Sequence, residues 1–69
     1  MDIADLENRF TYHSPKEGQP EKYGTLRHIA FKFALDIFNN CPDSHERSLA
    51  ITKLEEAVMW ANASIARNE

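Results

Sequence analysis

Residues 43–67 read DSHERSLAITKLEEAVMWANASIAR and carry the strongest helix signal in the chain. It contains neither glycine nor proline, and it is rich in alanine, leucine, glutamate and lysine, which are strong helix formers. Asp43 with Glu46 three residues later matches a capping box in its Asp-capped form, and Ser44 is a rival N-cap. The stretch therefore predicts one helix of about 24 residues that ends near Arg67.

A second long helix is predicted immediately before it. Pro20 suits the first turn of a helix, because its missing N–H would have no intrahelical partner there. The run NNCP at 39–42 supplies residues that tolerate left-handed backbone, followed by a proline that disfavours helix in the residue before it. We expect a helix from about Pro20 to Asn39 or Asn40, in which Gly24 costs roughly 1 kcal/mol relative to alanine. So short a connection makes the two helices antiparallel neighbours, an αα-hairpin.

The N-terminal part of the chain predicts a short helix and a loop. Asp2 is suited to cap a brief helix that runs to about Asn8. The segment SPKEGQP at 14–20 holds two prolines and a glycine without apolar periodicity, which is typical of a loop. The predicted fold class is all-α: a short N-terminal helix, a loop and a long antiparallel αα-hairpin, in a single domain over residues 1–69.

The apolar residues of both long helices cover a wider arc than one partner helix can bury. In the first of these helices, one stripe at i, i+3, i+4, i+7 spacing should pack on the second helix, and another lies about 100° further round. The first stripe is Tyr23, Leu26, Ala30, Phe33, Ala34 and Ile37, and the other is Phe31, Leu35 and Phe38. In the second helix the main stripe is Ala50, Leu54, Ala57, Val58, Ala61 and Ile65, with Leu49, Met59, Trp60, Ala63 and Ala66 outside it.

This surplus of apolar surface predicts self-association. An exposed patch of this size exceeds what soluble monomers usually tolerate. A chain of 69 residues buries only about 60% of its unfolded surface, and its one cysteine, Cys41, cannot form an internal disulfide. We therefore predict an obligate homo-oligomer whose protomers share a core. In the alternative, the N-terminal helix and the loop fold over the outer stripes within one chain.

The charge of the chain is unevenly distributed. Residues 1–8 carry −3, residues 9–32 carry +3 and residues 33–69 carry −3, in agreement with the net charge of −3. An acidic protein is poorly suited to duplex DNA, whose affinity is built on many phosphate contacts, whereas a local basic window can hold a small anion. The single cysteine also favours a reducing, cytoplasmic environment.

Several functional classes are disfavoured by the residue pattern. No segment approaches the roughly 18 to 20 apolar residues of a membrane span, and the N-terminus has acids where a secretory signal has bases. The spacings of the three histidines and Cys41 match no zinc pattern. Cys41 has no base beside it and should cap the apolar end of the hairpin, while Glu55 and Glu56 point about 100° apart. We expect no metal, no cofactor, no membrane partner and no catalysis.

Cations and planar side chains alternate in the basic window. They are Arg9, Phe10, Tyr12, His13, Lys16, Lys22 and Arg27. Nucleobases stack on aromatic faces, and phosphates accept charge-assisted hydrogen bonds. This composition suits a ligand with both nucleobase and phosphate without specifying it. On the residues alone, Phe10 and Tyr12 are equally suited to pinning the N-terminal segment onto the hairpin.

The chain resembles a known family of small phage proteins, the anti-CBASS cyclic-nucleotide sponges. The resemblance spans FTYHSPKEGQPEKYGTLRHIAFKFAL at 10–35 and NNCPDSHERSLAITKLEEAVMWANASIARNE at 39–69. Its most specific pieces are LEEAVMWAN and IARNE in the second run. The motifs Tyr-His-x-Pro and Tyr-x-x-Leu-Arg in the first run support it. The resemblance implies a helical hairpin that assembles as a homohexamer.

The resemblance also implies a function and candidate site residues. Members of the family hold cyclic di- and trinucleotides, such as 3′,3′-cGAMP and cyclic tri-AMP, at protomer interfaces without cleaving them, and so keep the antiviral effector inactive in the cytoplasm of the infected bacterial host. Tyr12 matches the family's base-stacking tyrosine, and Arg27 matches its phosphate-binding position. Arg67, within IARNE, is a candidate contact of a second pocket for cyclic trinucleotides. Lys22 and His13 are added from their charge and position.

Two other classes of function are alternatives to the sequestration of cyclic nucleotides. A small helical adaptor would use its outer apolar stripes to bind a host protein instead of its own copies. A small DNA-binding regulator is the other alternative, but the acidic second long helix would repel a duplex. An adaptor would be a monomer at micromolar concentration, and a regulator would bind DNA with a steep dependence on salt.

Overall fold

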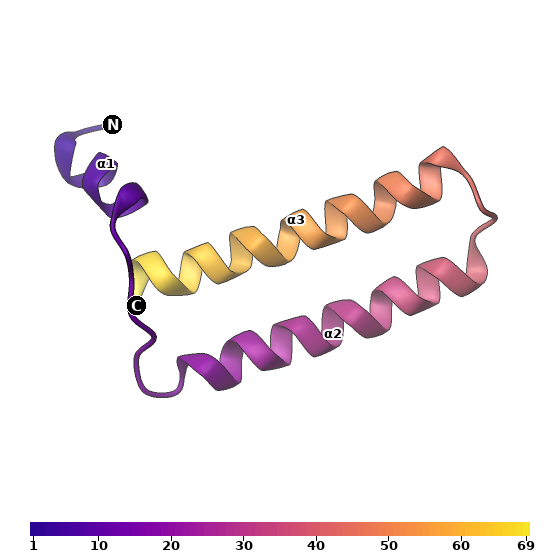
Figure 1. Cartoon of the computed structure of the whole chain (residues 1–69), viewed down its shortest axis with the longest axis horizontal. Helices are drawn as coiled ribbons and strands as arrows, with labels where there is room; N and C mark the ends of the chain where they lie inside the picture. Colours follow the sequence, from indigo (N-terminus) through magenta and orange to yellow (C-terminus); the bar gives the residue numbers. More distant parts are fainter.

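The computed structural model describes all 69 residues and is entirely helical. Its elements are α1 (Ile3–Phe10), α2 (Gln19–Asn40) and α3 (His45–Asn68), with no strands. Figure 1 shows α2 and α3 running side by side in opposite directions as a long flat hairpin, while α1 stands off beyond its open end. The predicted all-α hairpin is therefore confirmed. The molecule measures 45 × 28 × 13 Å, so it is only about one helix layer thick.

Helix α1 is held by its own end groups. Asp2 is the N-cap: its carboxylate accepts a hydrogen bond from the Asp5 N–H at 2.8 Å, and the Asp5 carboxylate accepts one from the Asp2 N–H at 3.5 Å. This reciprocal pair satisfies two backbone donors that a helix start leaves free. The helix runs to Phe10, two residues further than expected, and Thr11 closes it by donating through Oγ1 to the Glu7 carbonyl at 2.6 Å.

Helix α2 begins at Gln19, one residue before the proline that was expected to open it. Gly18 is the N-cap with φ of 84°, a left-handed conformation that side chains disfavour. The helix ends at Asn40 as predicted, and the Cys41 N–H donates to the Ile37 carbonyl at 3.0 Å. The expectation that Cys41 caps the apolar end of the hairpin is wrong, because its side chain is exposed beyond the last turn.

Helix α3 starts from Ser44 and not from the predicted Asp43 capping box. The Ser44 Oγ accepts from the Arg47 N–H at 3.1 Å, so the rival N-cap is the one that forms. Asp43 lies one residue before this N-cap, and its carboxylate pairs with the Arg47 guanidinium at 3.0 Å. Because the Asp43 carboxylate pairs with Arg47 and does not cap the backbone, the predicted capping box of Asp43 and Glu46 does not form.

Arg47 closes the turn between the two long helices. Its guanidinium lies 4.4 Å from the centre of the Phe38 ring and donates through Nη1 to the Phe38 carbonyl at 3.1 Å and the Cys41 carbonyl at 3.4 Å. The cation therefore satisfies carbonyls that the end of α2 leaves without partners. One arginine thus joins the end of α2 to the start of α3.

The contact between α2 and α3 covers only a narrow stripe. No apolar side chain is fully buried. The half-buried residues at the contact are Tyr23, Leu26, Ala30, Ala34 and Ile37 from α2, and Ile51, Leu54, Val58, Ala61 and Ile65 from α3. Phe33, Ala50 and Ala57 were assigned to this stripe, but they lie at its edge and are exposed. Narrower burial than expected leaves still more apolar surface open.

The large side chains of the outer apolar stripes remain uncovered within one chain, whereas Ala63 and Ala66, predicted to lie outside the main stripe, are half-buried. Phe31, Leu35, Phe38, Leu49, Met59 and Trp60 are all exposed. The only extensive packing between helices is that of α2 with α3, and α1 lies apart from these stripes (Figure 1). The alternative in which the N-terminal segment folds over them does not occur. Phe10 and Tyr12 are 84% and 82% exposed, so they do not pin this segment to the hairpin either.

Neither a membrane-spanning helix nor a metal-binding cluster is present in the structure. None of the three helices combines the length and the apolarity that crossing a membrane requires. No three histidine, cysteine, aspartate or glutamate side chains gather closely enough to hold a metal ion.

The two glycines are expected to respond oppositely to substitution by alanine. Gly18→Ala should lower the free energy of unfolding by about 1–2 kcal/mol, because φ of 84° is strained for any residue with a Cβ. Gly24→Ala should raise it by about 0.5–1 kcal/mol, since a Cβ there meets only Arg27 Nη2 at an unstrained 3.9 Å. Urea unfolding of both variants at one protein concentration measures this. Equal effects of the two changes would contradict the assigned Gly18 conformation.

Candidate ligand-binding site

Arg27 lies at a shallow hollow between the two long helices. The hollow has a volume of about 370 Å³ and is lined by Tyr23, Arg27, Asn62, Ala63 and Ala66. The Arg27 side chain makes no ion pair and no hydrogen bond within the chain. A guanidinium without an internal partner, beside a hollow, is suited to bind an anionic group such as a phosphate.

Asn62 brings an unmatched polar group to the same hollow. Its Oδ1 is enclosed by protein atoms and has no hydrogen-bond partner. A buried acceptor left without a donor typically costs about 1–3 kcal/mol. The neighbouring surface is apolar: a second hollow, of about 380 Å³, adjoins Arg27 and includes Phe31 and Met59 in its lining. The Arg27 guanidinium, the Asn62 amide and the Phe31 ring therefore line neighbouring hollows of the hairpin.

Arg67 lies on a neighbouring surface of α3. It lines a hollow of about 480 Å³ together with Trp60, Met59 and Ala63, and Ala63 also lines the Arg27 hollow. The two arginines therefore face adjacent hollows on one side of the hairpin. Trp60 is 63% exposed beside Arg67 and was assigned no binding role from the sequence. The sequence feature that could have pointed to Trp60 is its position outside the main apolar stripe of its helix.

Lys22 lies away from Arg27. It lines a hollow of about 450 Å³ with Leu26, Ile65 and Glu69 in the other groove between the helices. Five residues separate the two cations along α2, which places them about 140° apart at 100° per residue. The Lys22 ammonium also has an internal partner, the Glu69 carboxylate at 2.7 Å. A single chain does not bring Lys22 and Arg27 to one site.

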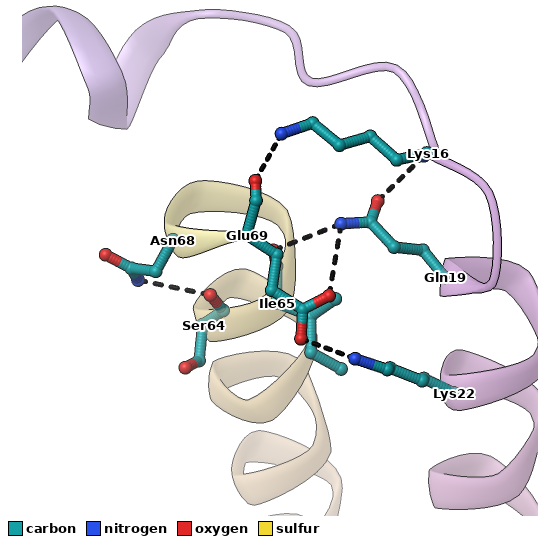
Figure 2. A network of polar contacts seen from close by, with 7 residues as sticks. All are labelled: Lys16, Gln19, Lys22, Ser64, Ile65, Asn68 and Glu69. Atoms are coloured by element: carbon teal, nitrogen blue, oxygen red, sulfur yellow. Dashed lines mark hydrogen bonds and ion pairs between the residues drawn. The ribbon is translucent and has the colours of Figure 1, made fainter.

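A polar network surrounds Glu69 where the chain segments meet at the open end of the hairpin (Figure 2). Lys16 Nζ donates to the Glu69 carbonyl, and Gln19 Nε2 is 3.5 Å from both the Glu69 carboxylate and the Ile65 carbonyl. The hydrogen bond from Lys22 is the largest influence holding the pKa of the Glu69 carboxyl below its ordinary value, while desolvation opposes it. Gln19 belongs to no periodic or charge pattern, and Glu69 was noted only as one acid of the C-terminal window and the last residue of IARNE, so the sequence did not predict their contact.

Tyr12 and His13 behave differently although they are adjacent. His13 is half-buried, and its ring donates through Nε2 to the Asn8 carbonyl at 2.9 Å. Tyr12 is exposed and lines none of the hollows described above. The Tyr12 ring is therefore exposed to solvent and does not line the hollow of Arg27. The roles of both residues in binding remain predictions.

The fold and these surfaces define a small helical-hairpin protein in which Arg27 and Arg67, neither of them in an ion pair, line open hollows; Glu55 and Glu56 also line the Arg67 hollow. A comparison with protein families identifies the family of the chain. The family model described as "Acb2/Tad1, hairpin domain" matches residues 1–66, and the chain belongs to this family, the anti-CBASS sponges. The match confirms the resemblance noted in the sequence. No curated protein and no solved structure shows a significant match to the chain.

Proposed function

We propose that this protein binds cyclic di- and trinucleotide second messengers, such as 3′,3′-cGAMP and cyclic tri-AMP, and sequesters them without cleavage. By removing the messenger it would prevent activation of the CBASS effector. The observation that carries the proposal is the family match over residues 1–66. Capture requires affinity and copy number, not turnover, so the protein acts stoichiometrically. We place this action, as a phage anti-defence function, in the cytoplasm of the infected bacterium.

The arrangement of the candidate residues supports binding between copies. Tyr12 is displayed outward from one end of the chain, whereas Arg27 lies at a hollow along the hairpin. An assembly in which one copy supplies the aromatic ring and another the guanidinium joins stacking with phosphate binding. In a two-fold site, two Arg27 side chains each meet one phosphate of a two-phosphate ring. We propose that the assembly is a homohexamer and that Arg67 serves a separate pocket.

An adaptor function is the second candidate. The exposed outer stripes, including Phe31 and Phe38, are the observation that favours it, because a host protein is able to cover them as well as a second copy is. Sedimentation separates the two candidates. A monomer at micromolar concentration supports the adaptor, and a hexamer supports the sponge.

Native mass spectrometry with a panel of cyclic nucleotides tests the proposed function. We expect six copies of the chain in one particle and integral numbers of bound cyclic di- and trinucleotides. Linear dinucleotides of the same bases serve as controls and should bind more weakly, because they lack the closed ring. After heat release the ligand should be recovered intact. A linearised product would indicate hydrolysis, and uptake of none of the panel would refute sequestration.

A further inference from the structure

The N-terminal segment that carries Tyr12 is held to the hairpin almost entirely by polar contacts. Only α2 and α3 pack extensively on each other, and Figure 1 shows α1 standing beyond the open end. Phe10 and Tyr12 contribute no burial, since both are more than four-fifths exposed. The direction in which Tyr12 points therefore depends on hydrogen bonds at the open end of the hairpin.

One contact with the hairpin and one within the segment flank Tyr12. Asn8 donates through Nδ2 to the Arg67 carbonyl of α3 at 3.2 Å. The His13 ring donates to the Asn8 carbonyl at 2.9 Å, which folds the chain back immediately after Tyr12. Both bonds are partly buried, and only the first joins the segment to α3.

Gln19 anchors the other side of the segment. It is the only buried residue of the chain, 3% exposed. Its Oε1 accepts a hydrogen bond from the Lys16 N–H at 2.9 Å, while its Nε2 lies 3.5 Å from the Ile65 carbonyl and from Glu69 Oε1. One buried amide thus connects the loop, the start of α2 and the end of α3 (Figure 2).

We propose that Gln19 is a positioning residue for Tyr12. It touches no ligand; it fixes the loop of residues 11–18 against α3, so that the Tyr12 ring is already placed when a ligand arrives. This inference rests on the proposed function in so far as Tyr12 is a ligand contact. Without the Gln19 amide the only side-chain contact from the loop itself to α3 is the exposed Lys16–Glu69 contact, and the ligand must order the loop on binding, which lowers affinity.

A double-mutant cycle in the full chain separates positioning from a general structural role. Gln19→Leu preserves volume and removes the amide, and it should weaken 3′,3′-cGAMP binding roughly tenfold by calorimetry, the loss expected for one or two hydrogen bonds. In a Tyr12→Ala background the same change should cost nothing further, because Gln19 acts through Tyr12. Losses that simply add, or no loss from Gln19→Leu, would overturn the proposal.

Asn68→Ala is the matched control at the same end of α3. Asn68 donates through Nδ2 to the Ser64 carbonyl at 3.1 Å, within its own helix, and reaches no part of the loop (Figure 2). Its removal should leave affinity unchanged. Loss of affinity equal to that of Gln19→Leu would show that any disturbance of this helix end is sufficient, against the proposal.

A charge-neutral exchange provides a rescue. Gln19→Glu keeps the acceptor for Lys16 but sets a second carboxylate against Glu69, so it should weaken binding as Gln19→Leu does. Adding Glu69→Gln restores one amide facing one carboxylate, although not the donor to the Ile65 carbonyl, and should recover part of the affinity. Failure of the exchange to recover any affinity contradicts the proposed contact.

Hydrogen exchange tests the positioning without any ligand. Gln19→Leu should speed amide exchange about tenfold at Lys16, whose N–H donates to Gln19 Oε1, and leave residues 26–60 unchanged, since only the loop contact is lost. Unchanged exchange at Lys16 would overturn the inference. If the wild-type protein binds no cyclic nucleotide, the proposed function fails, whereas the exchange result still decides whether Gln19 holds the loop. Should Gln19→Leu fail to fold, the Gln19→Glu and Glu69→Gln pair gives the same comparison.

Discussion

Phe33→Asp is expected to convert the assembled protein into monomers with much reduced helix content. Phe33 is 56% exposed and lines an entirely apolar hollow of about 220 Å³ between α2 and α3. The other residues of this hollow are Leu26, Ile29, Ala30, Leu54, Ala57, Val58 and Ala61. No apolar side chain is buried in the single chain, and the proposed homo-oligomer would cover this face with a second copy.

The expected effect of Phe33→Asp is large for a single substitution. Burial of a phenylalanine side chain is worth about 1.5–3 kcal/mol, and a carboxylate enclosed without a partner costs several kcal/mol more. In a symmetric assembly the loss is repeated in every copy. Because the hairpin alone buries so little, dissociation should also reduce its helicity.

Sedimentation velocity and far-UV circular dichroism at micromolar concentration measure this outcome. His28→Asp is the matched control, because it adds the same charge to an exposed position of α2 that lines none of the hollows. We expect the control to assemble normally. If both variants assemble normally, the apolar hollow beside Phe33 is not an interface, and the predicted shared core is wrong.

Arg27→Ala is expected to weaken binding of cyclic dinucleotides by about 1–3 kcal/mol, which is roughly 5-fold to 150-fold, while the assembly stays intact. The guanidinium has no partner within the chain, so its removal breaks no internal contact. The energy lost should be that of a charge-assisted hydrogen bond to phosphate. Tyr12→Ala should cause a loss of similar size, because one stacked base contributes about 1–3 kcal/mol.

Lys32→Ala is the control that separates a phosphate contact from general electrostatics. Lys32 is an exposed cation of the same helix and lines none of the hollows. Calorimetry should show nearly unchanged affinity for this variant. Equal losses for Arg27→Ala and Lys32→Ala would mean that net charge alone drives binding, and unchanged affinity in Arg27→Ala would exclude that residue from the site.

The bounds of the long helices were predictable to within one residue. Pro20, Gly18 and the NNCP turn are local signals whose effect on the backbone needs no tertiary contact. The N-cap of α3 was less predictable, because Asp43 and Ser44 are both good caps. In the structure the Ser44 hydroxyl caps the helix, while the Asp43 carboxylate pairs with the Arg47 guanidinium.

The candidate site was predictable only residue by residue. Composition and the family resemblance drew attention to a basic window that includes Lys22 and Arg27 as one group. The structure separates them into opposite grooves and gives Lys22 to Glu69, a partner 47 residues away in sequence. Gln19 was passed over as a loop residue, although it is the one buried side chain. Neither the Lys22–Glu69 ion pair nor the burial of Gln19 follows from the periodicity of the apolar residues.

The order of helices, their lengths, their antiparallel pairing and their surplus of apolar surface were all determined by the sequence alone. Each depends on caps, breakers and periodicity, which act over a few neighbouring residues. Only the tertiary structure decided which cation keeps an open charge, which edge of each stripe stays exposed and what holds the N-terminal segment. These depend on where the end of α3 meets the start of α2, because hydrogen bonds and ion pairs there join residues far apart in sequence.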